Sequence, residues 1–194
     1  MRKPFYRYFL GFRPDAWLRA TLVALGEEVG QRLQSELLHL TLCVIAEADE
    51  PDPFLCRRVG AALADQTLSS VPIRLGRVRG GDHGAVIQTI GNQADVQHFY
   101  RVLVGLLARR GIPPLYRKSG LHPHVTLGYA ACRFDPFATA IEWLPSELLL
   151  IESEVGNGKH RVIGRWPLLP PPQGVLDLRP GAAAAAASRL IGPV

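Results

Sequence analysis

Apolar positions recur along this chain with two periods, and the change from one period to the other predicts a mixture of short strands and amphipathic helices. Residues 5–12 alternate like a strand, and from Asp15, a candidate N-cap, the apolar residues follow the helical period as far as Gly30. The pattern further predicts strands over 38–46, 71–78, 85–90, 124–130, 148–155 and 161–168, with helices after Pro51, from Asn92 to Arg110 and over 136–141.

This order of elements mixes strands and helices without strict alternation, so it favours an α+β fold over a doubly wound one. The composition changes after Pro167, where three prolines at 170–172 and six alanines at 182–187 replace the periodic pattern. Proline removes backbone donors that a sheet needs, and short isolated helices are marginal in water. We therefore expect a catalytic unit over 1–169 and a flexible Pro/Ala-rich extension over 170–194.

Composition and charge narrow the class of protein. A chain of 194 residues that is 47% hydrophobic can bury the core of one domain, and a formal net charge of +5 favours an anionic partner. The three cysteines are odd in number and lack metal-site spacing, which argues against a disulfide framework and for a reducing, cytoplasmic compartment. No signal peptide or membrane span is expected, and nothing in the sequence demands more than a monomer.

A His-x-Thr unit occurs twice, each time within an apolar strand-like run: His39-Leu40-Thr41-Leu42 and His124-Val125-Thr126-Leu127. Strand alternation places the histidine and the threonine of each unit on one face. Since histidine titrates near neutral pH, one imidazole can accept a proton while the other donates one, and a hydroxyl can hold a phosphate oxygen. The pair therefore predicts cleavage of a phosphodiester without a metal. The alternative, two strand histidines at the rim of a core, fits a single unit better than two.

These motifs, together with the apolar opening at 5–12, resemble the two-histidine (2H) phosphoesterases, and within them the bacterial proteins called 2′-5′ RNA ligase or RNA 2′,3′-cyclic phosphodiesterase. The resemblance covers roughly residues 4–169. It implies two pseudo-symmetric lobes, each with an antiparallel sheet flanked by helices, and an active-site cleft between them. It further implies that His39 and His124 are catalytic, that Thr41 and Thr126 bind phosphate, and that no cofactor is needed.

The reaction implied is the opening of 2′,3′-cyclic phosphate ends of RNA or nucleotides to a 2′-phosphate. One histidine acts as general base on water and the other as general acid on the leaving ribose oxygen, and the sequence leaves open which is which. Joining of RNA through 2′-5′ linkages and action on other phosphodiesters, such as 2′-5′-linked oligonucleotides or an ADP-ribose cyclic phosphate, also stay open. A hypothesis of another class is a catalytically silent RNA- or nucleotide-binding module that uses the same cleft.

One position departs from the resemblance. Many bacterial members carry a phosphate-holding arginine where this chain has Tyr129, which donates a hydrogen bond but no charge. Arg117 and Lys118, just upstream of the second motif, are the candidate replacements, and Tyr8 of the first strand is a candidate for stacking a base. No metal site is expected, because no carboxylate or cysteine cluster completes a ligand shell around the histidines of the second motif.

Overall fold

The computed structural model describes residues 5–116 and 121–171, and within them eight strands form a single sheet with three α-helices. In chain order the elements are β1 (Phe5–Phe12), α1 (Ala16–Glu28), β2 (Leu40–Ala48), α2 (Leu55–Leu63), β3 (Ile73–Arg79), β4 (Ala85–Thr89), α3 (Ala94–Ala108), β5 (His124–Gly128), β6 (Phe137–Trp143), β7 (Glu147–Val155) and β8 (Lys159–Pro167). A 3-10 turn, η1 (Ser35–Leu37), precedes β2.

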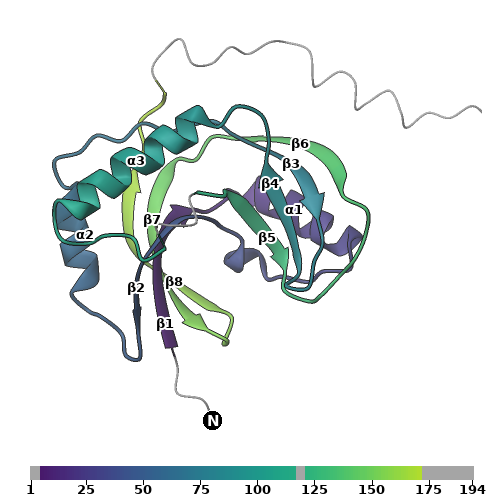
Figure 1. Cartoon of the computed structure of the whole chain (residues 1–194), viewed down its shortest axis with the longest axis horizontal. Coiled ribbons are helices and arrows are strands. Elements are labelled where there is room, and N and C mark those ends of the chain that lie inside the picture. Colours follow the sequence, from purple (N-terminus) through teal and green to yellow (C-terminus); the bar gives the residue numbers. More distant parts are fainter. Residues whose placement is uncertain (1–4, 117–120, 172–194) are drawn as a thin grey trace, which may run out of the picture.

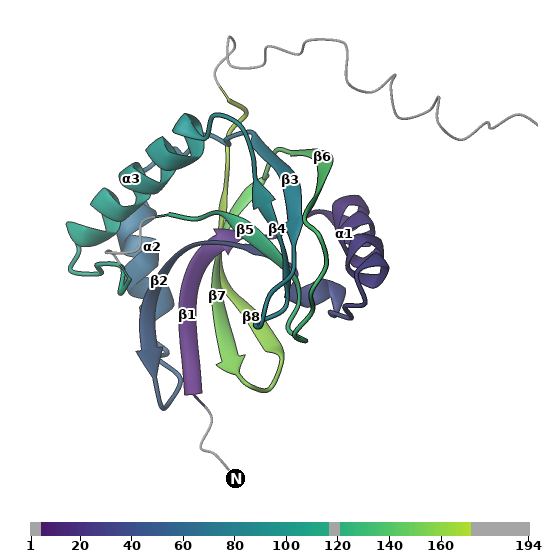
Figure 2. The same cartoon turned by 45° about the vertical axis from the view of Figure 1, so that its right-hand side comes forward.

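The strand order is β6-β3-β4-β5-β2-β1-β7-β8, and the named strands pair antiparallel throughout. The sheet curves strongly, with α2 and α3 on one side of the view and α1 on the other (Figure 1). The rotated view shows β1, β2, β7 and β8 side by side in one half and β3, β4, β5 and β6 in the other (Figure 2). The α+β class with two antiparallel halves is therefore confirmed.

The two halves meet at the two motif strands. β2 and β5 pair in register at Leu40 and Val125, which joins what the sequence suggested as two separate sheets into one continuous sheet. This joint is short, whereas β1 pairs with β2 and with β7 along most of its length. The halves consequently diverge on either side of the joint, and the motif strands lie at the centre of the molecule.

The main core fills the space between one face of the sheet and the helices. Apolar stripes of α1 and α3, such as Leu18 and Leu22 on α1 and Phe99 and Leu103 on α3, pack against buried strand residues there. A smaller cluster of Phe9, Leu149 and Ile151 lies apart from this core, with Val44 and Val162 packed against it. The half of the sheet that contains β1 and β7 is therefore apolar in patches on both faces.

Local signals placed most element boundaries. Asp15 caps α1 as expected, since its Oδ1 accepts a hydrogen bond of 2.8 Å from the backbone N of Leu18. At α3 the N-cap is Gln93 in place of the expected Asn92, although the Asn92 side chain still accepts from the backbone N of Ala94. None of the helices in the described ranges is both long and apolar enough to cross a membrane.

The prediction of a short helix over 136–141 was wrong. The segment is strand β6, which pairs with β3 from Ile73 opposite Trp143 to Val78 opposite Phe137. A helix of six residues is marginal by itself, so the hydrogen bonds offered by the free edge of β3 decide the conformation. At the end of the described chain, Leu169 exchanges backbone hydrogen bonds with residues 68 and 70, and most of the expected extension, 172–194, lies outside the described residues.

Candidate active site

The register between β2 and β5 places both His-Thr units on one face of the sheet. Leu40 and Val125 lie opposite each other and both are 0% exposed, because they point into the core. Side chains alternate along a strand, so the residues on either side of this pair point to the other face. Continuing the antiparallel register by one residue in each direction sets His39 across from Thr126 and Thr41 across from His124. Each imidazole therefore lies beside the hydroxyl of the other motif.

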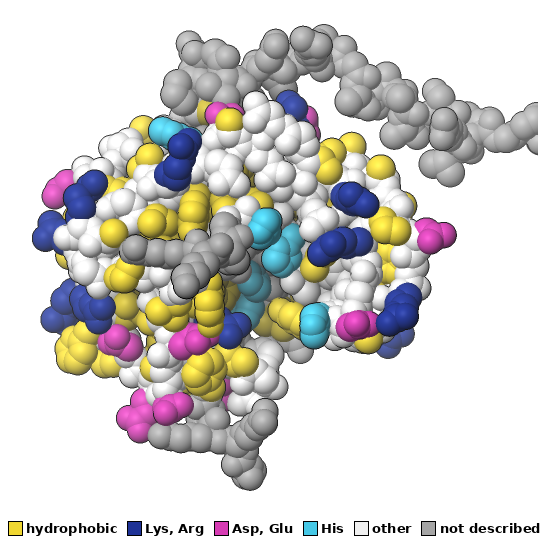
Figure 3. Space-filling view, in the orientation of Figure 1, with side chains coloured by type: hydrophobic (Ala, Val, Ile, Leu, Met, Phe, Trp, Pro, Cys, Tyr) yellow, Lys and Arg dark blue, Asp and Glu magenta, His cyan; other side chains and the backbone are white. Residues whose placement is uncertain are grey.

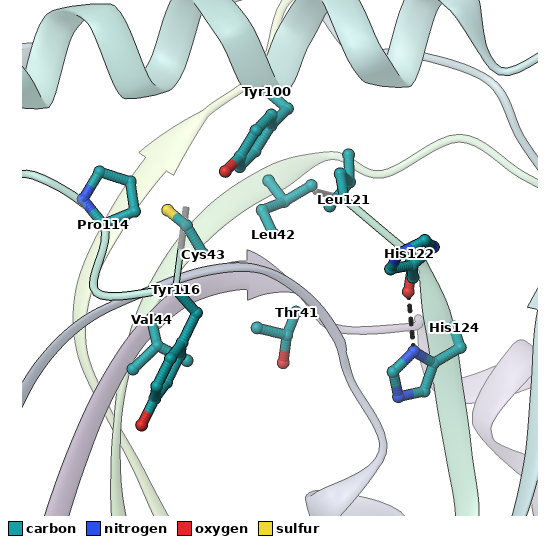
Figure 4. Close-up of a pocket in the computed structure, with 10 residues that line it drawn as sticks. All are labelled: Thr41, Leu42, Cys43, Val44, Tyr100, Pro114, Tyr116, Leu121, His122 and His124. Carbon is teal, nitrogen blue, oxygen red and sulfur yellow. Dashed lines mark hydrogen bonds between the residues drawn. The ribbon is translucent and has the colours of Figure 1, made fainter. Parts of the chain in front are cut away.

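The two histidines are held by the same local hydrogen bond. Nδ1 of His39 lies 2.6 Å from the carbonyl oxygen of Leu37, and Nδ1 of His124 lies 2.8 Å from that of His122, which Figure 4 shows as a dashed line. A carbonyl oxygen only accepts, so Nδ1 of each ring carries the proton. Nε2 is then the nitrogen of each neutral ring that exchanges a proton with a ligand.

A hollow of about 310 Å³ adjoins the joint between the strands. Thr41 and His124 line one end of it, and the rest of the wall is mainly apolar and aromatic, formed by Leu42, Cys43, Val44, Tyr100, Pro114, Tyr116, Leu121 and His122 (Figure 4). On the surface, histidine side chains gather in the middle of the same face, next to apolar side chains (Figure 3). The site thus has a polar end at the motifs and an apolar end beside them.

His39 is half-buried among rings. Its ring centroid lies 4.6 Å from that of Phe9 and 4.9 Å from that of His160, a histidine of β8 whose Nδ1 is buried and has no hydrogen-bond partner among residues 5–116 and 121–171. Burial is the main reason that the pKa of His39 falls to about 4, and positive charge at His160, Arg13 and His124 lowers it further against the raising effect of the Leu37 carbonyl. His39 is consequently neutral at pH 7 and able to accept a proton.

Arg13 is a cation that the sequence alone did not single out. It follows β1 directly, and the pairs Gly11–Thr41 and Phe12–Leu40 set it next to His39 in the continued register. Its Nε and Nη2 atoms are buried and have no hydrogen-bond partner within the described residues. The sequence did contain a signal for this position. The alternation of β1 places Phe9 and Gly11 on one face of the strand, and its continuation by two residues places Arg13 on the same face.

Tyr8 does not lie at this site, contrary to expectation. It is 0% exposed and belongs to the main core, on the opposite face of β1 from Phe9. Its hydroxyl donates to a carboxylate oxygen of Glu152 at 3.0 Å and accepts from the backbone N of Asp52 at 2.7 Å. Strand alternation explains the difference, since the even-numbered residues of β1 point towards the helices.

The other candidate phosphate-holding residues are placed only in part. Tyr129 follows β5 directly, is 62% exposed and is hydrogen-bonded to Thr126, so it borders the site. Arg117 and Lys118 lie outside the described residues. Within the ranges 5–116 and 121–171, no three side chains of His, Cys, Asp or Glu are grouped so that they could hold a metal ion.

Solved structures share this architecture. E. coli LigT complexed with ATP superposes with a TM-score of 0.63 at 18% identity, over 86% of this chain and 99% of LigT. The chain has the LigT fold. TT0787 of Thermus thermophilus matches with a TM-score of 0.65 at 21% identity, over 84% of this chain and 98% of that one. The PDE domain of MHV ns2 matches with a TM-score of 0.55 at 16% identity, over 76% and 99% of the two chains.

The resemblance carried by the paired His-x-Thr motifs predicted this fold. The solved structures confirm the prediction at the level of the fold. Sequence comparison adds nothing to this, because no family model and no curated protein matches the chain. Identities of 16% to 21% are compatible with one architecture carrying different chemistry, so the activity has to be argued from the site itself.

Proposed function

We propose that the protein is a metal-independent cyclic phosphodiesterase that opens 2′,3′-cyclic phosphate ends of RNA or nucleotides to a 2′-phosphate. The observation that carries the proposal is the pairing of Leu40 with Val125, which sets two imidazoles and two hydroxyls on one face beside a hollow. A phosphate between the two motifs meets a base on one side and an acid on the other, and this is the arrangement that in-line displacement at phosphorus needs.

The lowered pKa of His39 supports this residue as the general base, since its ring is neutral at pH 7. Nε2 of His39 takes a proton from water as the water oxygen bonds to phosphorus. The bond from phosphorus to the ribose 3′ oxygen then breaks, and protonated His124 gives that oxygen a proton from Nε2. Each such transfer contributes about a hundred- to ten-thousand-fold to the rate. With a 5′ hydroxyl in place of water as the nucleophile, the same pair joins two RNA ends: the 5′ oxygen bonds to phosphorus, the bond to the ribose 3′ oxygen breaks, and a 2′-5′ linkage results.

Thr41 and Thr126 are proposed to donate their hydroxyl hydrogens to the non-bridging phosphate oxygens. The register supports this role, because each hydroxyl lies across from the histidine of the other strand. Donors fixed in advance around developing negative charge stabilise a transition state more than mobile water does. In this proposal the two threonines hold the phosphate, and the two histidines activate the water and protonate the leaving oxygen.

The apolar part of the hollow is proposed to receive the nucleoside. Tyr100 and Tyr116 offer aromatic faces there, and Leu42, Pro114 and Leu121 complete an apolar wall next to Thr41 and His124. Any nucleobase has a π face that stacks on such rings. LigT, which has the same fold, has been solved with ATP, with 3′-AMP and with NADP+, all of them nucleotides, and with phosphate.

The test is turnover of a nucleoside 2′,3′-cyclic phosphate in the presence of EDTA, with the product identified as the 2′-phosphate. We expect His39→Ala and His124→Ala each to lower kcat by at least about a hundredfold. His98→Ala, which changes an exposed histidine of α3, is the matched control and keeps full activity. Activity that survives either motif substitution, or that requires a divalent metal, contradicts the proposal. Binding without turnover in the unmodified protein supports the silent binding module.

A further inference from the structure

Arg13 carries a positive charge that the described part of the protein leaves unpaired. Its Nε and Nη2 atoms are buried without a hydrogen-bond partner, and no salt bridge of the described residues involves it. The nearest charges include two further arginines, Arg19 and Arg165, against a single carboxylate, Glu36. Burial and these neighbouring cations together lower the pKa of Arg13. Arg13 as a whole is half-buried, but its two buried nitrogens have lost contact with water that no protein group among the described residues replaces, and an anionic ligand would satisfy them.

The strand register shows where such a ligand lies. On one face of β1 the side chains follow the order Phe9, Gly11, Arg13, and Gly11 is paired with Thr41 on β2. Gly11 contributes no side chain, and any side chain there would collide with the carbonyl oxygen of Leu40. An anion held by the Thr41 hydroxyl therefore lies beside Gly11, and Arg13 is the next residue on that face. The long arginine side chain spans this single position.

The described residues around Arg13 do not offer its guanidinium another negatively charged partner. His39 and His160 both have a pKa lowered to about 4, first by burial, and are neutral or positive at any pH, so neither neutralises a guanidinium. Glu36, the carboxylate whose charge acts on Arg13, is exposed, accepts a hydrogen bond from the Ser35 hydroxyl, and forms no salt bridge with Arg13 among the described residues.

We propose that Arg13 binds the phosphate held between the two His-Thr pairs and supplies the positive charge that Tyr129 cannot. The ligand class is a phosphate monoester or diester, and the inference rests on the proposed position of the substrate phosphate but not on turnover. Arg13 thereby fills the role for which the sequence suggested Arg117 or Lys118. A guanidinium is suited to it, because it donates two parallel hydrogen bonds to phosphate oxygens.

The test measures binding of inorganic phosphate and of a nucleoside 2′-monophosphate by calorimetry, in the full-length protein. Arg13→Met keeps the aliphatic bulk and removes the charge, and we expect its dissociation constants to rise by about ten- to a hundredfold, the usual range for a lost charge-assisted hydrogen bond. Arg13→Lys keeps a positive charge but loses the two parallel donors of the guanidinium, so we expect its dissociation constants to lie between those of the unmodified protein and those of Arg13→Met. Arg19→Gln is the matched control: it removes one charge from the same group of arginines, and its dissociation constants stay within about twofold of those of the unmodified protein.

A second readout separates ligand binding from a structural role. Because the substitution removes two buried nitrogens that lack a partner within the described residues, ligand-free Arg13→Met unfolds at the same or a higher temperature than the unmodified protein, but phosphate no longer raises that temperature. Unchanged phosphate affinity in Arg13→Met overturns the inference, and so does an unmodified protein that binds no phosphate. If ligand-free Arg13→Met fails to fold, Arg13→Lys decides, since undiminished affinity in that variant also overturns it.

These outcomes stay separate from those of the proposed reaction. If the unmodified protein binds phosphate through Arg13 but cleaves no cyclic phosphate, the proposed activity is wrong and this inference stands. If the protein cleaves the cyclic phosphate and Arg13→Met has unchanged KM and kcat, the proposed activity stands and this inference is wrong.

Discussion

The imidazole rings of His39 and His160 meet edge to face, with their centroids 4.9 Å apart. His39 directly precedes β2 and His160 lies on β8, and these strands are three strand intervals apart in the sheet, a distance of about 14 Å if the sheet were flat. The two rings nevertheless meet, because the sheet curves and because both rings lie against the ring of Phe9. The edge strand β8 thus reaches the first motif, and a third histidine stands beside the proposed general base.

The first prediction concerns the pH dependence of activity. His39 must be neutral to accept a proton, and its pKa is lowered to about 4, mainly by burial and further by the charges of His160, Arg13 and His124. We expect kcat/KM to hold its value as the pH falls past 6.5 and to drop only near pH 4. The basic side of the bell-shaped profile reports loss of the proton from the acid. Rates measured from pH 3.5 to 9 check this.

Replacing His160 refines the same measurement. His160→Phe keeps a ring against Phe9 and His39 but removes a positive charge that opposes protonation of His39, so the acidic limb moves to higher pH. His98→Phe on α3 is the control and leaves the limb in place. An acidic limb near pH 6.5 in the unmodified protein contradicts the assignment of His39 as base.

Protein stability is expected to depend on pH through the same two residues. The pKa values of His39 and His160 are lowered to about 4, chiefly by burial, whereas both titrate near 6.5 in the unfolded chain. As the pH falls from 6.5 to 4, the unfolded state takes up protons that the native state refuses, so the free energy of unfolding decreases by about 3 kcal/mol for each histidine. Urea denaturation at pH 7 and pH 4.5 measures the loss, and His160→Phe reduces it.

Tyr8→Phe should affect stability and not catalysis. The substitution removes a hydroxyl that donates to Glu152 and accepts from the backbone N of Asp52, which leaves the buried carboxylate with Arg161 as its one side-chain partner within the described part of the chain. We expect a loss of about 1–3 kcal/mol in the free energy of unfolding, with kcat and KM unchanged. Tyr6→Phe on the same strand is the control. A large change in KM for Tyr8→Phe instead restores this residue as a substrate contact.

The two threonines are expected to act on phosphate rather than on the fold. Thr41→Val and Thr126→Val remove a hydroxyl at nearly constant shape, and each should lower kcat/KM by about ten- to several-hundredfold, because a donor to the developing charge is lost. Thr21→Val changes a hydroxyl on α1 that bonds the carbonyl oxygen of Trp17, and it serves as the control. Full activity in both motif variants shows that the hydroxyls do not contact the substrate.

Tyr116 allows the nucleoside position to be tested apart from the phosphate. Its ring lines the hollow, and its hydroxyl bonds Glu47 at 2.8 Å. Tyr116→Ala should raise KM for a nucleoside cyclic phosphate by about five- to a hundredfold and leave the affinity for inorganic phosphate unchanged, since stacking contributes about 1–3 kcal/mol per base. Tyr116→Phe keeps the ring and separates stacking from the bond to Glu47. Equal KM values in all three proteins place the nucleoside elsewhere.

The sequence was informative wherever the signal is local. Alternation identified β1, β7 and β8, and a single aspartate fixed the start of α1, because backbone geometry and capping depend on neighbours a few residues away. The same alternation put the histidine and threonine of each motif on one face before any partner strand was known. It failed at β6, where the partner β3 overrode a weak helical pattern.

What the chain alone determined, then, is which residues carry the chemistry and which face of its own strand each one occupies. Only the tertiary structure decided which strands meet: Leu40 opposite Val125, Arg13 next to His39, and His160 over Phe9. Periodicity records the inside and outside of an element, and that is a property of a few consecutive residues. Register between strands 85 residues apart, and the curvature that brings an edge strand to the centre, depend on the packing of the whole core, which no local pattern encodes.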